Sequence, residues 1–159
     1  MKIHLPSYSQ SLHLIEESLK PEELGLHDSA YVSDILARLN LDRHDPYLDF
    51  KISLKAKLHL DCDRCLDPFE YDLSAEGPMI YILGKSPRGE EIDDSDVAYI
   101  PLGTRDLDIS DVLRDLLVLS RPPLCICKED CLGLCSSCGA NLNLETCGCR
   151  KSESDLSIK

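Results

Sequence analysis

The clearest pattern in the sequence is a strict alternation of apolar and polar side chains over residues 51–60, KISLKAKLHL. A period of two over ten residues predicts a β-strand with one buried face. The alternation returns over Phe69–Ala75, after the intervening segment DCDRCLDP at 61–68. We therefore expect the two strands to form an antiparallel hairpin.

The polar faces of these two strands carry opposite charge, which predicts how the strands are aligned. If Leu60 lies opposite Phe69, then Lys57 faces Asp72 across the hairpin. A cross-strand charge pair of this kind contributes roughly 0.2–1 kcal/mol. A structure that places the two charged side chains on opposite faces of the sheet would exclude this register.

Other segments extend the sheet region. Tyr31–Leu41 alternates like a strand but also contains apolar residues at helical spacing, and we favour the strand. Met79–Leu83 is a compact apolar run between a proline and a glycine, and we expect another strand there. Gly84–Asp96 is rich in Gly, Pro, Ser and carboxylates, which predicts a loop.

The segment Asp108–Ser120 has the pattern of an amphipathic helix. Its apolar positions are 109, 112, 113, 116 and 117. This spacing places them on one helical face. Asp108 or Ser110 can cap the N-terminus, and the Arg-Pro-Pro sequence at 121–123 ends the helix.

Charge and composition narrow the function. The chain of 159 residues is 43% hydrophobic and 29% charged, as in ordinary globular domains. Its formal net charge of −12 argues against a protein that grips nucleic acid through its overall field, because phosphate attracts the opposite sign. Residues 84–115 hold nine acidic and four basic side chains.

The N-terminal segment lacks the apolar core of a signal peptide, and no apolar run is long enough to span a bilayer. We therefore expect a cytoplasmic protein without a membrane partner.

Nine cysteines are the most unusual feature, and seven of them fall between residues 125 and 149. Clustered thiols of an intracellular protein are metal ligands more often than disulfide partners. The two-residue spacing in CSSC at 135–138 suits one metal, and the following glycine allows a tight turn. The first choice for a tetrahedral zinc site is Cys135, Cys138, Cys147 and Cys149. Cys127 and Cys131 compete for places in it.

The tip of the predicted hairpin offers a second set of ligands. Cys62 and Cys65 repeat the two-residue spacing, and with Cys127 and Cys131 they would form another four-thiolate site. Eight cysteines then divide into two structural zinc sites, and Cys125 is left over. For the hairpin pair taken alone, a packing or redox role stays an alternative to zinc.

Other chemistries could use the same cysteines. An iron–sulfur cluster also takes four thiolates, and metal-free thiols are the simplest alternative, but free thiols rarely crowd in this way, so structural zinc is favoured. A thioredoxin-like redox role fits poorly, because that motif lies between a strand and a helix, whereas a strand follows Cys65. No phosphate-binding loop, nucleophile elbow or His/Asp/Glu catalytic set is present, so nothing indicates an enzyme.

These patterns predict an α+β fold: an antiparallel β-rich sheet with one packed helix and a C-terminal Cys-rich zinc-binding module. The expected domains are a β-rich domain at 1–120 that ends in the helix, the zinc-binding module at 121–150, and a disordered tail at 151–159. One or two zinc ions would be the cofactor.

The motifs also carry a family resemblance. CDRCL at 62–66, LDIS at 107–110, and CKEDCLGLCSSCGANLN with CGC at 127–149 resemble the YceD family of large ribosomal RNA subunit accumulation proteins. The resemblance covers about residues 51–149, whereas the first 50 residues match only in general character. Cys125 departs from the pattern, because it lies two residues before the family's usual first C-terminal cysteine.

The resemblance implies a non-catalytic ribosome biogenesis factor that supports the accumulation or processing of large-subunit (23S) ribosomal RNA. It implies a precursor of the large ribosomal subunit, or its rRNA, as the partner. A small basic ribosomal protein of the large subunit is a further expected partner, and the acidic surface suits it. The alternatives are a thiol redox protein and a zinc-ribbon nucleic-acid adaptor.

Overall fold

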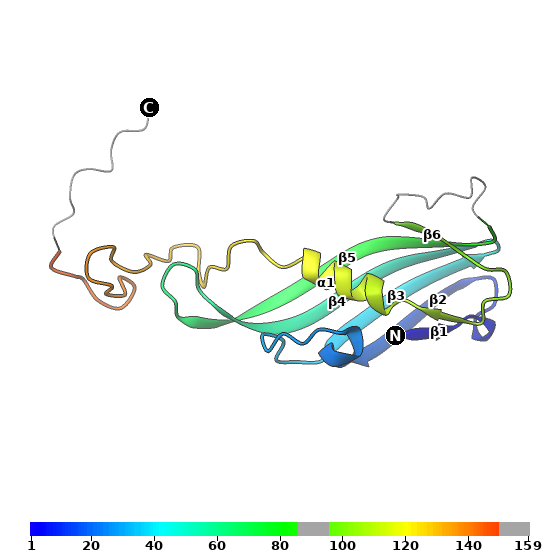
Figure 1. Cartoon of the computed structure of the whole chain (residues 1–159), viewed down its shortest axis with the longest axis horizontal. Helices are drawn as coiled ribbons and strands as arrows, with labels where there is room; N and C mark the ends of the chain where they lie inside the picture. The colour runs from blue at the N-terminus through cyan, green and yellow to red at the C-terminus, as the bar shows by residue number, and fades with distance from the viewer. Residues whose placement is uncertain (86–95, 150–159) are drawn as a thin grey trace, which may run out of the picture. The chain divides into compact units, whose positions relative to one another are not determined.

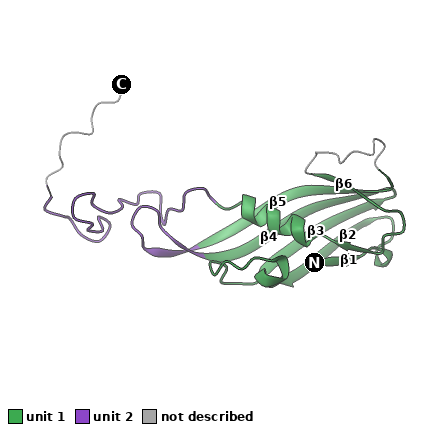
Figure 2. Cartoon of the chain, viewed as in Figure 1, with its two compact units in different colours: residues 1–58, 71–121 green, residues 59–70, 122–159 purple. Residues whose placement is uncertain are grey.

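The structure is a computed structural model that describes residues 1–85 and 96–149. It consists of two compact units, shown in different colours in Figure 2. The sheet unit comprises residues 1–58 and 71–121, and the cysteine unit comprises residues 59–70 and 122–159. The tip of the predicted hairpin thus lies in the same compact unit as the C-terminal cysteines. The expected tail at 151–159 lies outside the described residues.

A five-stranded sheet in the order β2-β3-β4-β5-β6 forms the sheet unit (Figure 1). Its strands are β2 (Leu12–Leu19), β3 (Ile35–His44), β4 (Tyr47–Asp61), β5 (Pro68–Leu83) and β6 (Val97–Ile100). Strands β2, β3 and β4 pair antiparallel, but β6 runs parallel to β5. The expected antiparallel sheet is therefore wrong at this edge. Residues 84–96 separate β5 from β6 along the sequence, and parallel strands need a connection of about a dozen residues or more.

Short elements complete the described chain. They are β1 (Lys2–His4), η1 (Leu5–Ser7), η2 (Pro21–Leu24), β7 (Asp106–Asp108) and α1 (Ser110–Leu119). Strands β1 and β7 pair with each other in a separate two-stranded sheet. The loop expected at 84–96 falls mostly on residues 86–95, which lie outside the described part of the chain. No helix among the described residues is long and apolar enough to cross a membrane.

The hairpin of β4 and β5 is confirmed, and so is its register. Lys57 Nζ lies 3.4 Å from a carboxylate oxygen of Asp72. Four residues further along each strand, the hydroxyl of Ser53 donates to the carboxylate of Glu76 at 3.3 Å, as the same register requires. The charged side chains therefore share one face of the sheet, and the apolar residues of β4 are buried on the other.

The strand expected at Met79–Leu83 is not separate, because it continues β5 without a break. Pro78 suggested a boundary before the expected strand, but it lies within β5. The neighbouring Gly77 serves the packing of α1. A Cβ at Gly77 would lie 2.7 Å from a methyl carbon of Leu116 in that helix. The glycine thus lets the helix lie close to the sheet.

The core of the sheet unit lies between the apolar face of the sheet and α1. Leu113 and Leu117 of α1 have no exposed surface, and the same is true of Leu54 and Leu58 in β4. The expected helix is confirmed, with its first residue at Ser110. The expected cap at Asp108 or Ser110 is wrong, because the N-cap is Ile109, which makes no side-chain cap hydrogen bond. The carboxylate of Asp108 instead accepts hydrogen bonds from the Ser110 backbone N–H at 3.0 Å and from the Ser110 hydroxyl at 2.6 Å.

The ambiguous segment at 31–41 is a strand, as favoured, although β3 begins only at Ile35 and extends to His44. Tyr31 instead forms an isolated bridge with Leu58. Strand β2 was not predicted. As an edge strand it leaves Leu12 and Leu14 exposed, so its sequence lacks the contrast between a buried and a solvated face.

Candidate metal centres

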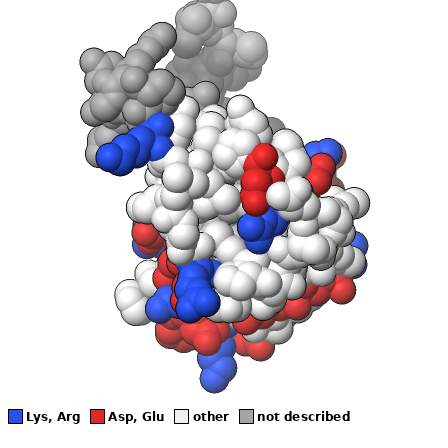
Figure 3. All heavy atoms as spheres, turned by 90° about the vertical axis from the view of Figure 1, so that its right-hand side faces the viewer, with Lys and Arg blue, Asp and Glu red and all other residues white. Residues whose placement is uncertain are grey.

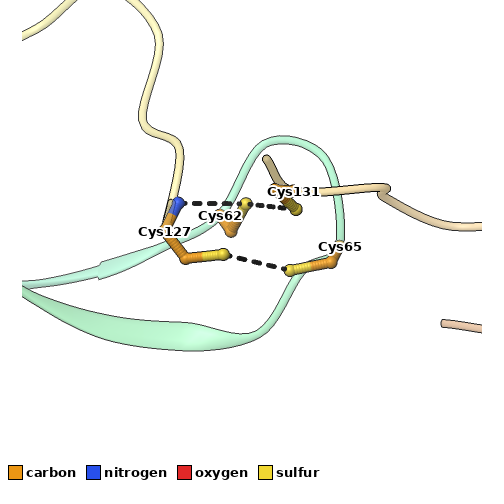
Figure 4. Close-up of side chains that lie close together, drawn as sticks. All are labelled: Cys62, Cys65, Cys127 and Cys131. Carbon is orange, nitrogen blue, oxygen red and sulfur yellow. Dashed lines mark hydrogen bonds between the residues drawn. The ribbon is translucent and has the colours of Figure 1, made fainter. Parts of the chain in front are cut away.

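Four cysteines from two distant segments meet in the cysteine unit, as Figure 4 shows. We call them site A: Cys62, Cys65, Cys127 and Cys131. Their sulfur atoms all lie within 4.8 Å of one another. The sulfur of Cys62 is 3.8 Å from that of Cys131, and the sulfur of Cys65 is 3.7 Å from that of Cys127. Tetrahedral zinc with Zn–S bonds of about 2.3 Å places its sulfurs about 3.8 Å apart, so the spacing fits zinc.

The hairpin tip shapes the first half of site A. The backbone N–H of Leu66 donates to the carbonyl of Cys62 at 2.8 Å, and Leu66 adopts a positive φ of 61°. This tight turn brings the two cysteine side chains of the tip to the same side. Both are buried, with exposed fractions of 0% for Cys62 and 3% for Cys65.

The thiols of the hairpin tip differ in acidity. Burial opposes the ionisation of Cys62, but the backbone N–H groups of Cys127, Cys65 and Arg64 point at its sulfur and lower its pKa to about 6. The backbone N–H of Asp67 also favours the thiolate of Cys65. Burial and the neighbouring cysteines outweigh this effect and raise the pKa of Cys65 to about 12. The backbone N–H groups around Cys62 thus favour its thiolate, which is the form of cysteine that binds a metal ion.

Cys125 holds the C-terminal segment against the hairpin tip through its backbone. Its carbonyl accepts from the N–H of Asp63 at 2.8 Å, and its N–H donates to the Asp63 carboxylate at 2.6 Å. Its sulfur belongs to neither of the two cysteine groups. The ninth cysteine therefore has a structural role in the backbone beside site A.

The last four cysteines form a second group, which we call site B: Cys135, Cys138, Cys147 and Cys149. Their sulfurs also lie within 4.8 Å of one another, and those of Cys135 and Cys147 are 3.4 Å apart. A tight turn follows the first pair, in which Gly139 has φ of 73° and donates its N–H to the Cys135 carbonyl at 2.9 Å. Cys138 and Cys149 are exposed, so site B is more open than site A.

Backbone N–H groups and neighbouring cysteines also set the acidity of the thiols in site B. The backbone N–H groups of Cys138 and Ser137 point at the sulfur of Cys135 and lower its pKa to about 6. The pKa of Cys149 is raised to about 12, chiefly by its interaction with Cys138. Backbone N–H groups directed at a cysteine sulfur are the surroundings that a metal-bound thiolate requires.

The structure thus brings together every cysteine singled out as a ligand, in two groups of four. Cys127 and Cys131 join the hairpin pair and do not compete for site B. Sequence reasoning missed the polar side chains that surround the sulfurs. The amide of Asn143 donates to the sulfur of Cys131 at 3.4 Å, and the guanidinium of Arg64 donates to the Cys131 carbonyl at 3.1 Å. The NLN sequence at 141–143 stood within the quoted motif, but its spacing alone gave no reason to select it.

Gly133 lies where the segment between the two sites passes the hairpin tip. It has φ of 73°, and a Cβ there would lie 2.9 Å from the Arg64 carbonyl oxygen. We expect Gly133→Ala to destabilise the cysteine unit by about 1–3 kcal/mol, because alanine must adopt a left-handed conformation and displace the backbone. Protection of residues 122–149 against proteolysis would measure the loss.

Gly139→Ala is the matched control for this prediction. Gly139 has the same φ of 73°, but a Cβ there meets nothing within 4 Å. It should therefore show only the conformational cost. Equal losses in the two variants would contradict the role given to the contact between Gly133 and Arg64.

Comparison with known proteins identifies the family. The family model described as "Large ribosomal RNA subunit accumulation protein YceD" matches residues 50–157. The chain belongs to the YceD family. The match spans all eight cysteines of sites A and B, and it confirms the resemblance seen in the motifs.

Two curated proteins are similar to part of the chain. "Large ribosomal RNA subunit accumulation protein YCED homolog 1, chloroplastic" of Arabidopsis thaliana is 41% identical over 64 residues, which are 40% of this chain and 20% of that protein. The protein of the same name from Zea mays is 37% identical over 62 residues, which are 38% of this chain and 21% of that protein. The matching segment thus spans about a fifth of the length of each relative. No solved structure matches the chain.

Proposed function

We propose that this YceD family member is a non-catalytic, cytoplasmic factor of ribosome biogenesis that supports the accumulation of large-subunit ribosomal RNA. The observation that carries the proposal is the family match, which extends over two-thirds of the chain and includes both four-cysteine sites. The two similar plant proteins bear the same function in their names.

We further propose that zinc occupies sites A and B and stabilises the cysteine unit. The spacing of the sulfurs and the backbone N–H groups directed at them support this assignment. A zinc ion held by four thiolates acts as a cross-link. Because four protein ligands leave no open coordination position, such sites have a structural role and activate no substrate.

Charge favours a basic partner. The net charge is −12, and Figure 3 shows carboxylates along the lower edge of the face in view, with Lys and Arg side chains between some of them. Such a surface attracts a basic ribosomal protein of the large subunit more strongly than free RNA. Local RNA contacts are compatible with this, because Lys51 and Lys55 are exposed on β4.

Depletion of the protein tests the function. We expect fewer large subunits relative to small ones in a sucrose gradient, together with an accumulation of large-subunit rRNA precursors. Re-expression of the wild-type chain should restore the profile, and a Cys62→Ser/Cys135→Ser variant should restore it less well. An unchanged subunit ratio with normal precursor levels would overturn the proposal.

A thiol redox function is the second candidate, because the lowered pKa of Cys62 and Cys135, each about 6, favours reactive thiolates. The burial of Cys62 and Cys65 argues against it, since an attacking thiolate must reach its substrate. Alkylation of the native protein separates the two functions. Zinc-bound cysteines should resist iodoacetamide until a chelator is added, whereas a redox pair should react without one.

A further inference from the structure

We infer that sites A and B are energetically coupled through Asn143, so that a metal ion at one site raises the metal affinity of the other. This inference rests on the metal binding proposed above and goes beyond it. It assigns a positioning role to a side chain that is not itself a ligand. All residues involved belong to the cysteine unit.

Asn143 lies in the segment between two ligands of site B, but its side chain contacts a ligand of site A. It lies between Cys138 and Cys147, inside the segment that a metal at site B would close. Its side chain, however, points to a ligand of site A. The amide nitrogen donates to the sulfur of Cys131 at 3.4 Å, and the amide oxygen accepts from the backbone N–H of Leu132 at 2.9 Å.

Asn141 holds Asn143 in this orientation. The side-chain oxygen of Asn141 accepts from the backbone N–H of Asn143 at 3.0 Å and from its side-chain amide at 2.9 Å. The side-chain nitrogen of Asn141 donates to the carboxylate of Asp67 in the hairpin tip at 2.6 Å. The two asparagines therefore connect the loop of site B to the turn of site A.

The backbone reinforces this connection. The N–H of Leu134 donates to the carbonyl of Arg64 at 2.9 Å, and Leu134 also bridges to Asn141. The N–H of Leu142 donates to the carbonyl of Gly133 at 2.9 Å. The chain just after the last ligand of site A thus pairs with the loop of site B.

These contacts explain how coupling would arise. Four thiolates around a divalent ion leave an excess of negative charge, and an amide N–H donated to one sulfur offsets part of it. A metal at site B fixes both ends of the loop that carries Asn143, so the amide is already in place when site A binds metal. Binding couplings are reciprocal, so a metal at site A must favour site B by the same factor.

The two sites differ in exposure, and this difference sets the order in which a chelator should reach them. Cys62, Cys65 and Cys131 of site A are buried, whereas Cys138 and Cys149 of site B are exposed. A chelator should therefore reach site B first. Loss of that metal releases Asn143 and lowers the metal affinity of site A, so a chelator should remove the metal of site B before that of site A.

A double-mutant cycle on the full-length protein tests the coupling. The affinity of site A for Zn²⁺ is measured by competition with a chromophoric chelator, with and without a Cys138→Ser/Cys149→Ser change that disables site B. We expect disabling site B to lower the affinity of site A about tenfold or more. In an Asn143→Ala background, where site A is already weakened, disabling site B should have little further effect.

Two further variants test whether the effect is specific to the hydrogen bond from Asn143 to Cys131. Asn143→Asp keeps an acceptor for the Leu132 N–H but cannot donate to Cys131, so it should weaken site A even if Asn143→Ala folds poorly. Ser136→Ala changes an exposed side chain between Cys135 and Cys138, so it should leave the affinity of site A unchanged.

The outcomes separate the coupling from the proposed zinc sites. If the protein binds two zinc ions but the Zn²⁺ affinity of site A is the same with and without a functional site B, the coupling is overturned and the zinc proposal stands. Equal additional losses on disabling site B, with and without Asn143, would overturn the role of Asn143. A protein that binds no zinc at either site would overturn the zinc proposal itself.

Discussion

A Cys62→Ser variant is expected to lose the metal of site A and to unfold most of the cysteine unit, while the strands of the sheet unit remain. The reason is the small core of the cysteine unit. Its buried cluster consists of Cys62, Cys65 and Cys131, with only a few partly buried apolar residues packed against it. Structural zinc contributes about 10–16 kcal/mol of binding free energy in small domains, so its loss cannot be offset by such a core.

Metal analysis and limited proteolysis would measure this effect. The variant should contain less zinc than the wild type, and proteases should cleave it between residues 122 and 149 while the far-UV circular dichroism of the sheet persists. Cys125→Ser is the matched control, because the sulfur of Cys125 belongs to neither site. Full zinc content and unchanged protease resistance in Cys62→Ser would contradict the assignment of site A.

The stability of the sheet unit should depend on the buried side chains of α1. Leu113→Ala is expected to lower the free energy of unfolding by about 2–5 kcal/mol, because it leaves a cavity between α1 and the sheet. Leu113 has no exposed surface, and the helix packs close to the sheet at Gly77. Denaturant unfolding monitored by circular dichroism would measure the loss.

Val118→Ala is the control from the same helix. Val118 is 50% exposed, so its truncation should change the stability by no more than about 0.5 kcal/mol. If the two variants unfold at the same denaturant concentration, the buried face of α1 has been assigned wrongly.

The parts of the fold that sequence analysis predicted are those in which one face is buried and the other solvated. Strand β4 alternates because its apolar residues reach the core and its polar ones reach water. Strand β2 lies at the sheet edge and exposes Leu12 and Leu14, so its pattern is blurred. Strand β6 gave no signal of its direction, because parallel pairing depends on the path of the preceding chain and not on local alternation.

The two groups of four cysteines were predictable for a different reason. Spacing identifies pairs of cysteines, because two intervening residues let both sulfurs reach one ion. Spacing does not say which pairs combine, and the sequence left Cys127 and Cys131 between two sites. The hairpin turn decides it by placing Cys62 and Cys65 beside them. The contact of Asn143 with Cys131 depends on how the later loop folds back, which local patterns do not contain.

The two sites close chain segments of very different length. Cys65 and Cys127 are 62 residues apart, whereas Cys135 and Cys147 are 12 residues apart. By the loop-entropy relation for cross-links, closing the longer segment removes roughly 4 kcal/mol of unfolded-chain entropy, against roughly 3 kcal/mol for the shorter one. The longer segment contains all of β5, β6, β7 and α1. A metal at site A would therefore restrict the unfolded form of the sheet unit as well, and its stabilising effect would extend to strands that never touch the ion.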